Sequence, residues 1–185
     1  MLKREDCRLR PMAEADLDQV LSWRNSERIR RAMYTDHIIS PEEHRAWFSR
    51  ARQTGSSSHF IFEYKDIPIG VVNVTDIDPL ARRCNWGFYI GVENAPRGGG
   101  SAMGFFALEH LFEKLNFRKV VGEALGSNNA SVKYHLRLGF VQEGCLVEHV
   151  LKDGESVDVI SFAIFDRDWY EIKGPLAARF FDDGR

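Results

Sequence analysis

The feature that most constrains the fold is a glycine-rich loop that joins a strand-like segment to a helix-like segment. Residues 86–91 read WGFYIG, and residues 97–102 read RGGGSA. Large apolar residues then recur at helical spacing from 105 to 115. The first turn of a helix leaves its amides without partners, and glycines let the backbone come close to a ligand. The pattern therefore predicts an anion-binding site at the start of this helix.

Two common phosphate-binding motifs do not fit this loop. The GxxxxGK[ST] motif needs a lysine after the glycines, and none is present. The GxGxxG motif, counted from Gly98, would place its third glycine at Met103. The pattern that does fit is [Q/R]xxGx[G/A], from Arg97 to Ala102. A plain flexible turn before a core helix remains the alternative.

The rest of the chain predicts one α/β domain over residues 1–170. Apolar, β-branched and aromatic runs bounded by turns predict strands at 7–11, 59–64, 67–77, 83–92, 119–125, 141–151 and 156–165. Helices are expected from about Asp16, from Ser40, over 101–115 and over 129–138. Short turns between the strands of residues 59–92 predict antiparallel pairing there. Residues 171–185 are expected to form a loosely held C-terminal tail.

Composition excludes several classes of protein. The 185 residues carry a formal net charge of -2, which does not suggest a nucleic-acid partner. No stretch approaches the ~20 apolar residues that cross a bilayer, and the start is not a signal peptide, so we expect a cytoplasmic protein without a membrane partner. The three cysteines are far apart and odd in number, so neither a disulfide framework nor a metal site is expected.

A second motif, C-terminal to the glycine loop, also resembles a known family. Residues 128–140, with Asn128, Ser131 and Gly139-Phe140, resemble the NxxSxxxYxxxGF stretch of GNAT-superfamily acetyltransferases. Together the two segments extend the resemblance over roughly residues 5–165. It implies a mixed, mostly antiparallel sheet with flanking helices and two splayed central parallel strands, with acetyl-CoA between them. The implied cofactor-binding residues are Phe88, Tyr89, Ile90, Arg97, Gly98, Gly99, Gly100, Ser101, Ala102, Asn128 and Ser131.

The same resemblance implies direct attack of an amine on acetyl-CoA in a ternary complex. The family's usual acid, a tyrosine, falls on His135 in this register, so His135 is the expected proton donor and neighbouring Tyr134 the alternative. Glu123 is the expected base, because the resemblance implies that its strand lies beside the acceptor channel and alternation places its carboxylate on one face of the sheet. Asn73 is expected to hold a relay water. A backbone amide between Phe88 and Ile90, near a strand bulge, is the expected oxyanion donor.

The N-terminal half contains a set of residues that suggests an acceptor. The pattern WRN…MY…EEHxxWF resembles the N-acetyltransferases of pseudaminic acid biosynthesis, which supply flagellin glycosylation. These enzymes acetylate the 4-amino group of UDP-4-amino-4,6-dideoxy-N-acetyl-β-L-altrosamine. The implied acceptor-binding residues are Arg24, Asn25, Met33, Tyr34, His44 and Trp47. N-terminal acetylation of a ribosomal protein, polyamine acetylation and a non-enzymatic CoA-binding module remain alternatives, and a homodimer is possible.

Overall fold

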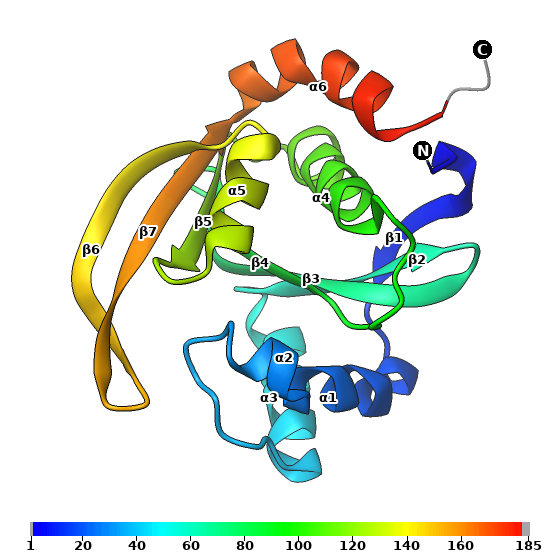
Figure 1. Ribbon diagram of the computed structural model, residues 1–185. Coiled ribbons are helices and arrows are strands. Elements are labelled where there is room, and N and C mark those ends of the chain that lie inside the picture. The colour runs from blue at the N-terminus through cyan, green and yellow to red at the C-terminus, as the bar shows by residue number, and fades with distance from the viewer. Residues whose placement is uncertain (1, 183–185) are drawn as a thin grey trace.

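The computed structural model describes residues 2–182, and its seven strands form a single sheet. The strands lie in the order β1-β2-β3-β4-β5-β7-β6 (Figure 1). Their bounds are β1 (Cys7–Pro11), β2 (Ser58–Tyr64), β3 (Ile67–Asp78), β4 (Arg83–Ile90), β5 (Lys119–Leu125), β6 (Val141–Lys152) and β7 (Glu155–Phe165). The sequence prediction of these strands and of a GNAT-type mixed sheet is confirmed.

The pairing of β4 with β5 is the one parallel pair between named strands of residues 2–182. It runs from Arg83↔Lys119 to Trp86↔Gly122 and stops there. Both strands continue, β4 to Ile90 and β5 to Leu125, without pairing to each other. The expected splay of two central parallel strands is therefore present, and it opens a gap in the middle of the sheet.

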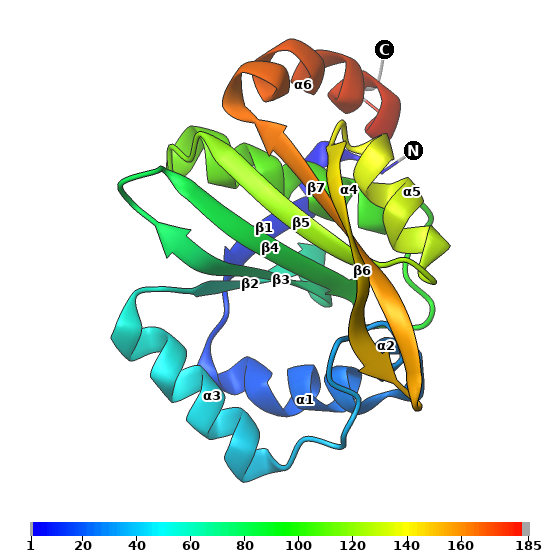
Figure 2. The ribbon, with the colours of Figure 1, turned by 90° about the vertical axis from the view of Figure 1, so that its left-hand side faces the viewer.

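Helices cover both faces of the sheet (Figures 1 and 2). On one face lie α4 (Gly99–Glu109), the π-helical turn η3 (His110–Lys114), α5 (Asn129–Arg137) and α6 (Asp166–Phe180). On the other lie α1 (Leu17–Asn25), α2 (Glu27–Arg30) and α3 (Pro41–Thr54). The short segments η1 (Arg4–Asp6) and η2 (Glu14–Asp16) flank β1. Each face has its own buried apolar cluster, so the sheet separates two cores.

Local sequence explains where the predicted helices begin and end. The Ser40 hydroxyl accepts a hydrogen bond from the Glu43 amide at 3.1 Å, and Pro41 occupies the first turn of α3. Gly55, at φ +63°, ends that helix. The Asn128 side chain caps α5 by accepting from the Ser131 amide at 3.1 Å. No helix within residues 2–182 is both long enough and apolar enough to cross a membrane.

The C-terminal segment differs from the expectation of a loose tail. Residues 166–180 form α6, and its Trp169 is fully buried against Phe105 and Phe112 of the α4 side. The Trp169 indole also donates to Glu113 at 3.0 Å. Pro175 lies inside this helix without ending it. The tail prediction is wrong up to residue 182, and residues 183–185 lie outside the described part.

Candidate active site

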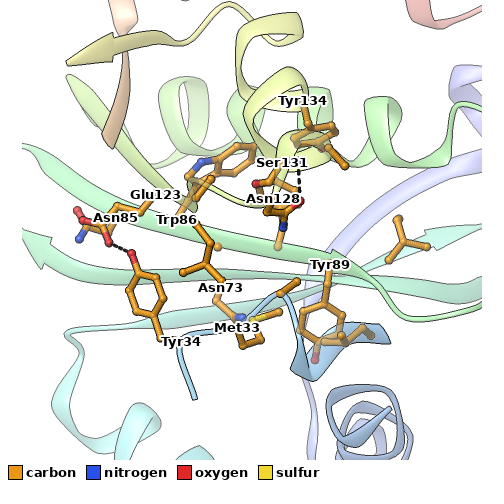
Figure 3. Close-up of a pocket in the computed structure, with 18 of the residues that line it drawn as sticks. Met33, Tyr34, Asn73, Asn85, Trp86, Tyr89, Glu123, Asn128, Ser131 and Tyr134 are labelled. Atoms are coloured by element: carbon orange, nitrogen blue, oxygen red, sulfur yellow. Dashed lines mark hydrogen bonds between the residues drawn. The ribbon is translucent and has the colours of Figure 1, made fainter. Parts of the chain in front are cut away.

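A cavity of about 690 Å³ passes through the gap between β4 and β5. Figure 3 shows that Tyr134, Ser131 and Asn128 lie on the α4–α5 side of the strands, whereas Tyr34, Met33 and Tyr89 lie on the α1–α3 side. Of the predicted site residues, the cavity is lined by Arg24, Met33, Tyr34, Asn73, Phe88, Tyr89, Ile90, Gly100, Glu123, Asn128, Ser131 and Tyr134. The splay thus brings together residues far apart in the sequence.

The glycine loop forms the start of α4 at one mouth of this cavity. Gly98 caps the helix at φ +92°, a backbone conformation that side-chain-bearing residues rarely adopt. Gly100 and Met103 line the cavity, whereas Arg97, Gly98, Gly99, Ser101 and Ala102 do not. These five form the entry to the helix and its first turn rather than the cavity wall. Amides of such a first turn carry partial positive charge, which suits a diphosphate.

The splayed part of β4 supplies backbone donors beside the gap. The Gly91 amide donates to Ile69 of β3 at 2.8 Å, whereas the Ile90 carbonyl accepts from Arg28 at 3.0 Å on the other side. Because successive amides in a strand point to opposite sides, those of Phe88 and Ile90 point away from β3, toward the gap. The expected bulge is absent there, since the β3–β4 register is continuous from Gly70 to Thr75 and shifts only between Thr75 and Asp78.

The structure corrects the assignment of the proton donor on α5. His135 is 1% exposed, stacks on Phe162 and does not line the cavity. Its Nδ1 contacts the Ser131 carbonyl at 2.9 Å, and its Nε2 accepts from the Trp86 indole at 3.3 Å. Burial lowers the pKa of His135 to about 4, so the ring is neutral near pH 7 and is a core residue. The prediction of His135 as the acid is therefore wrong.

Tyr134 lies at the cavity instead. Its hydroxyl donates to the Gly100 carbonyl at 2.6 Å, and its ring packs on Phe88 with centroids 4.4 Å apart. Burial raises the pKa of the Tyr134 phenol, so the group holds its proton at neutral pH. Tyr134 is thus the protonated group of α5 beside the glycine loop.

Two carboxylates, those of Glu123 and Asp76, lie on the opposite, α1–α3 side of the cavity. Glu123 is exposed at its edge and accepts a short hydrogen bond from the Tyr34 hydroxyl (Figure 3). Asp76 also lines the cavity and accepts from the Asn85 side chain at 2.9 Å. Burial and the neighbouring Glu123 charge raise the pKa of Tyr34, which keeps that phenol a donor. This side is therefore equipped to receive a cation or a proton.

Three of the residues expected to bind the acceptor do not line the cavity. The Asn25 side-chain amide is occupied by the backbone of Ile39, with both hydrogen bonds at 2.9 Å. His44 is 5% exposed and stacks on Trp47 with centroids 5.1 Å apart, between the helices and the sheet. Asn25, His44 and Trp47 are therefore structural, because their polar and aromatic groups hold the helices and the segment after α2.

That segment, residues 31–40, covers one wall of the cavity. Arg24 donates to the Thr35 carbonyl at 2.8 Å, and desolvation lowers its guanidinium pKa. Lys152, at the end of β6, donates to the Met33 carbonyl at 2.6 Å and pairs with Asp36 at 3.7 Å. The β6–β7 hairpin thus holds Met33 and its neighbours in place over the gap.

Sequence reasoning missed several cavity residues. Gly87, Asp76 and Asn85 line the acceptor side, and Trp86 and Arg28 also contribute. The strand pattern contained a usable signal for some of them, because Asn73↔Gly87 and Thr75↔Asn85 are cross-strand partners. No local signal marked Arg28, which reaches the site only through tertiary packing of α2 against β4.

This chain is similar to several known proteins. The family model described as an acetyltransferase (GNAT) domain matches residues 6–141. The spermidine N(1)-acetyltransferase of Vibrio cholerae is 25% identical over 153 residues, which cover 82% of this chain and 88% of that protein. An uncharacterized N-acetyltransferase of Bacillus subtilis, YokL, is 27% identical over 122 residues, covering 65% and 68%.

The fold also matches solved structures. The crystal structure of the spermidine N-acetyltransferase from Vibrio cholerae in complex with CoA and spermine has a TM-score of 0.84 to this chain. The two sequences are 22% identical over that match, which covers 90% of this chain and 99% of the other. At 22% sequence identity, this structural similarity shows a shared fold.

Proposed function

Because this chain belongs to the GNAT acetyltransferase family, which uses acetyl-CoA as cosubstrate, we propose that it acetylates a primary amine of a small molecule in a ternary complex. One observation carries the proposal. A single cavity crosses the sheet through the β4–β5 gap, with the glycine loop at one mouth and the Glu123 carboxylate at the other. A donor bound from the α4 side and an acceptor bound from the α1–α3 side would meet inside it.

The residues at the gap suit each proton and charge movement of the reaction. Glu123 takes a proton from the acceptor ammonium, directly or through a water held by Asn73. The neutral nitrogen attacks the acetyl carbonyl, and an amide of Phe88 or Ile90 stabilises the oxyanion. The carbon–sulfur bond then breaks, and the Tyr134 hydroxyl protonates the leaving thiolate. The raised pKa of Tyr134 keeps it protonated for this step. The second proton of the attacking nitrogen passes to the Tyr134 phenolate, which leaves a neutral amide.

For the acceptor, a polyamine is the class with most support. The spermidine N-acetyltransferases found among the relatives act on such molecules by name. In this chain, Glu123 and Asp76 place two carboxylates at the acceptor side of the cavity. A polyamine carries several ammonium groups, so one carboxylate can serve the reacting amine while the other binds a distant charge.

A UDP-amino sugar is the second candidate, and a different observation favours it. Two guanidinium-bearing side chains, Arg24 and Arg28, line the same cavity beside Met33 and Tyr34. Guanidinium groups suit a diphosphate, and an aromatic ring suits a nucleobase. The relatives reported above do not include an enzyme of pseudaminic acid biosynthesis, so this acceptor rests on the cavity and on the N-terminal sequence pattern.

A panel of acceptors tests the proposal. Purified protein is incubated with acetyl-CoA and, separately, spermidine, spermine, UDP-4-amino sugars including the altrosamine derivative, and N-terminal peptides of ribosomal proteins. Thiol release and product mass are both measured. Acetylation of a polyamine supports the first candidate, and acetylation of the altrosamine derivative alone replaces it with the second. Activity on peptides only would contradict a small-molecule acceptor.

A further inference from the structure

A row of three residues crosses the acceptor face of the sheet next to the cavity. His59 of β2 is the cross-strand partner of Asn73 in β3, and Asn73 is the partner of Gly87 in β4. Directly paired residues point to the same face of a sheet. Asn73 and Gly87 line the cavity, whereas His59 lies behind them and is 9% exposed. The mechanism proposed above does not use this histidine.

His59 contacts Asn73 through one defined hydrogen bond. Its Nδ1 lies 2.8 Å from Asn73 Oδ1. Its Nε2 is buried and has no hydrogen-bond partner. Burial lowers the pKa of His59, so the imidazole is neutral and carries one N–H. Buried N–H groups without an acceptor are rarer than buried acceptors without a donor. The proton therefore belongs on Nδ1, and His59 donates to Asn73.

The imidazole is fixed in place from its other side. Trp47 of α3 packs against it with ring centroids 4.4 Å apart. This contact holds the His59 imidazole between α3 and the sheet. Because Asn73 Oδ1 accepts the hydrogen bond from His59, the Asn73 NH₂ group can donate to a ligand or water in the cavity. A Cβ added at Gly87 would find nothing within 4 Å, so there is open space beside this amide.

We infer that His59 is a positioning residue that keeps the Asn73 NH₂ group directed at the relay water between the acceptor amine and Glu123. This inference rests on the proposed function. The water accepts hydrogen bonds from Asn73 and from the acceptor ammonium, and it donates to the Glu123 carboxylate. A proton passes from the ammonium nitrogen to the water while a water proton passes to Glu123, so charge and atoms balance. A flipped Asn73 would offer its oxygen instead and would withdraw the donor.

A double-mutant cycle tests whether His59 acts through Asn73. His59→Leu should lower kcat about tenfold, the value of one lost hydrogen bond of ~1.4 kcal/mol, while KM for acetyl-CoA stays the same. In an Asn73→Ala background the same change should have no further effect on kcat. His59→Asn, which restores a donor near the Nδ1 position, should recover most of the activity. Equal losses in both backgrounds would overturn the inference.

The matched control is His44→Leu. His44 is also buried, also has an unpartnered Nε2 and packs on the same Trp47, but the hydrogen-bond partner of Asn73 is His59 and not His44. Its substitution should leave kcat unchanged in the folded protein. A His44→Leu loss as large as that of His59→Leu would reduce the role of His59 to packing.

A second readout does not depend on turnover. Long-range ¹H–¹⁵N spectra of ¹⁵N-histidine-labelled protein report which nitrogen of His59 carries the proton. We expect the Nδ1–H form in the full-length protein and a changed shift in Asn73→Ala. An Nε2–H form would overturn the inference even if acetyl transfer is found. Absence of acetyl transfer together with the Nδ1–H form would refute the proposed function and leave the His59–Asn73 geometry supported.

Discussion

Tyr134→Phe separates the two candidate acids of α5 most sharply. The change removes the one hydroxyl of that helix that lies both at the cavity and beside the glycine loop, where it donates to Gly100 at 2.6 Å. Positioned acids and bases contribute about 10²- to 10⁴-fold to turnover, so kcat should fall at least ~100-fold. The lost hydrogen bond should cost only about 1 kcal/mol of folding free energy.

The companion change, His135→Phe, should show the opposite pattern. It leaves the Ser131 carbonyl and the buried Trp86 indole without the partners they have at 2.9 and 3.3 Å. Unsatisfied groups of this kind cost ~1–3 kcal/mol each, so the free energy of unfolding should fall by roughly 2–6 kcal/mol. Because His135 does not reach the cavity, kcat per folded molecule should stay within about threefold, well short of the effect expected of a catalytic acid.

Steady-state thiol release, with the acceptor that gives turnover in the wild type, measures kcat for both variants. Urea unfolding in parallel measures stability and the folded fraction. A fully folded His135→Phe protein that loses ~100-fold in kcat, beside a Tyr134→Phe protein that loses little, would show that His135 and not Tyr134 is the acid.

Three further expectations concern the gap and its surroundings. Gly122→Ala would place a Cβ 2.4 Å from His135 Nε2 and 2.6 Å from Trp86 Nε1, so urea unfolding should show a loss of about 1–3 kcal/mol, whereas Gly144→Ala, with nothing within 4 Å, should cost much less. Glu123→Gln should lower kcat by about 100-fold at unchanged KM for acetyl-CoA, and normal turnover would move the base elsewhere. The lowered pKa of His135, about 4 against 6.5 ordinarily, means that the unfolded chain binds the proton more tightly. Neutral His135 therefore contributes its full stabilisation to the folded protein above pH 6.5. The free energy of unfolding falls by roughly 3 kcal/mol as the pH is lowered to 4. Urea titrations at both pH values should show this slope in the wild type, and an equal slope in His135→Phe would contradict it.

The strands and most helices were predictable because their signals are local. Apolar runs between turn-forming residues marked β2 to β5, and Ser40 marked the start of α3. The segment after residue 165 was not predictable, since Pro175 and Gly174 argue against a helix when read alone. Burial of Trp169 against Phe105 outweighs those preferences.

The site was predictable only in part. The glycine loop could be predicted from its motif, which fixes the backbone. Glu123 and Asn73 could be predicted because alternation along a strand fixes the face of the sheet to which each side chain points. The choice between Tyr134 and His135 depends on how α5 rotates about its axis. The Trp86 indole and Phe162 together bind the imidazole in the core and so decide that rotation. Contacts of this kind come from distant strands and leave no local pattern.

Calorimetric titration of CoA into Gly100→Glu tests whether the start of α4 binds the diphosphate of acetyl-CoA. A Cβ at Gly100 makes only ordinary contacts, the nearest at 3.7 Å to Tyr134, so the variant should fold. A carboxylate about 4 Å from a phosphate at an effective dielectric of ~20 costs ~4 kcal/mol, which weakens binding at least ~100-fold. Gly100→Gln has the same length without the charge and should bind CoA far better than Gly100→Glu. Equal affinities for the two variants, or a wild type that does not bind CoA, would show that the start of α4 does not bind the diphosphate.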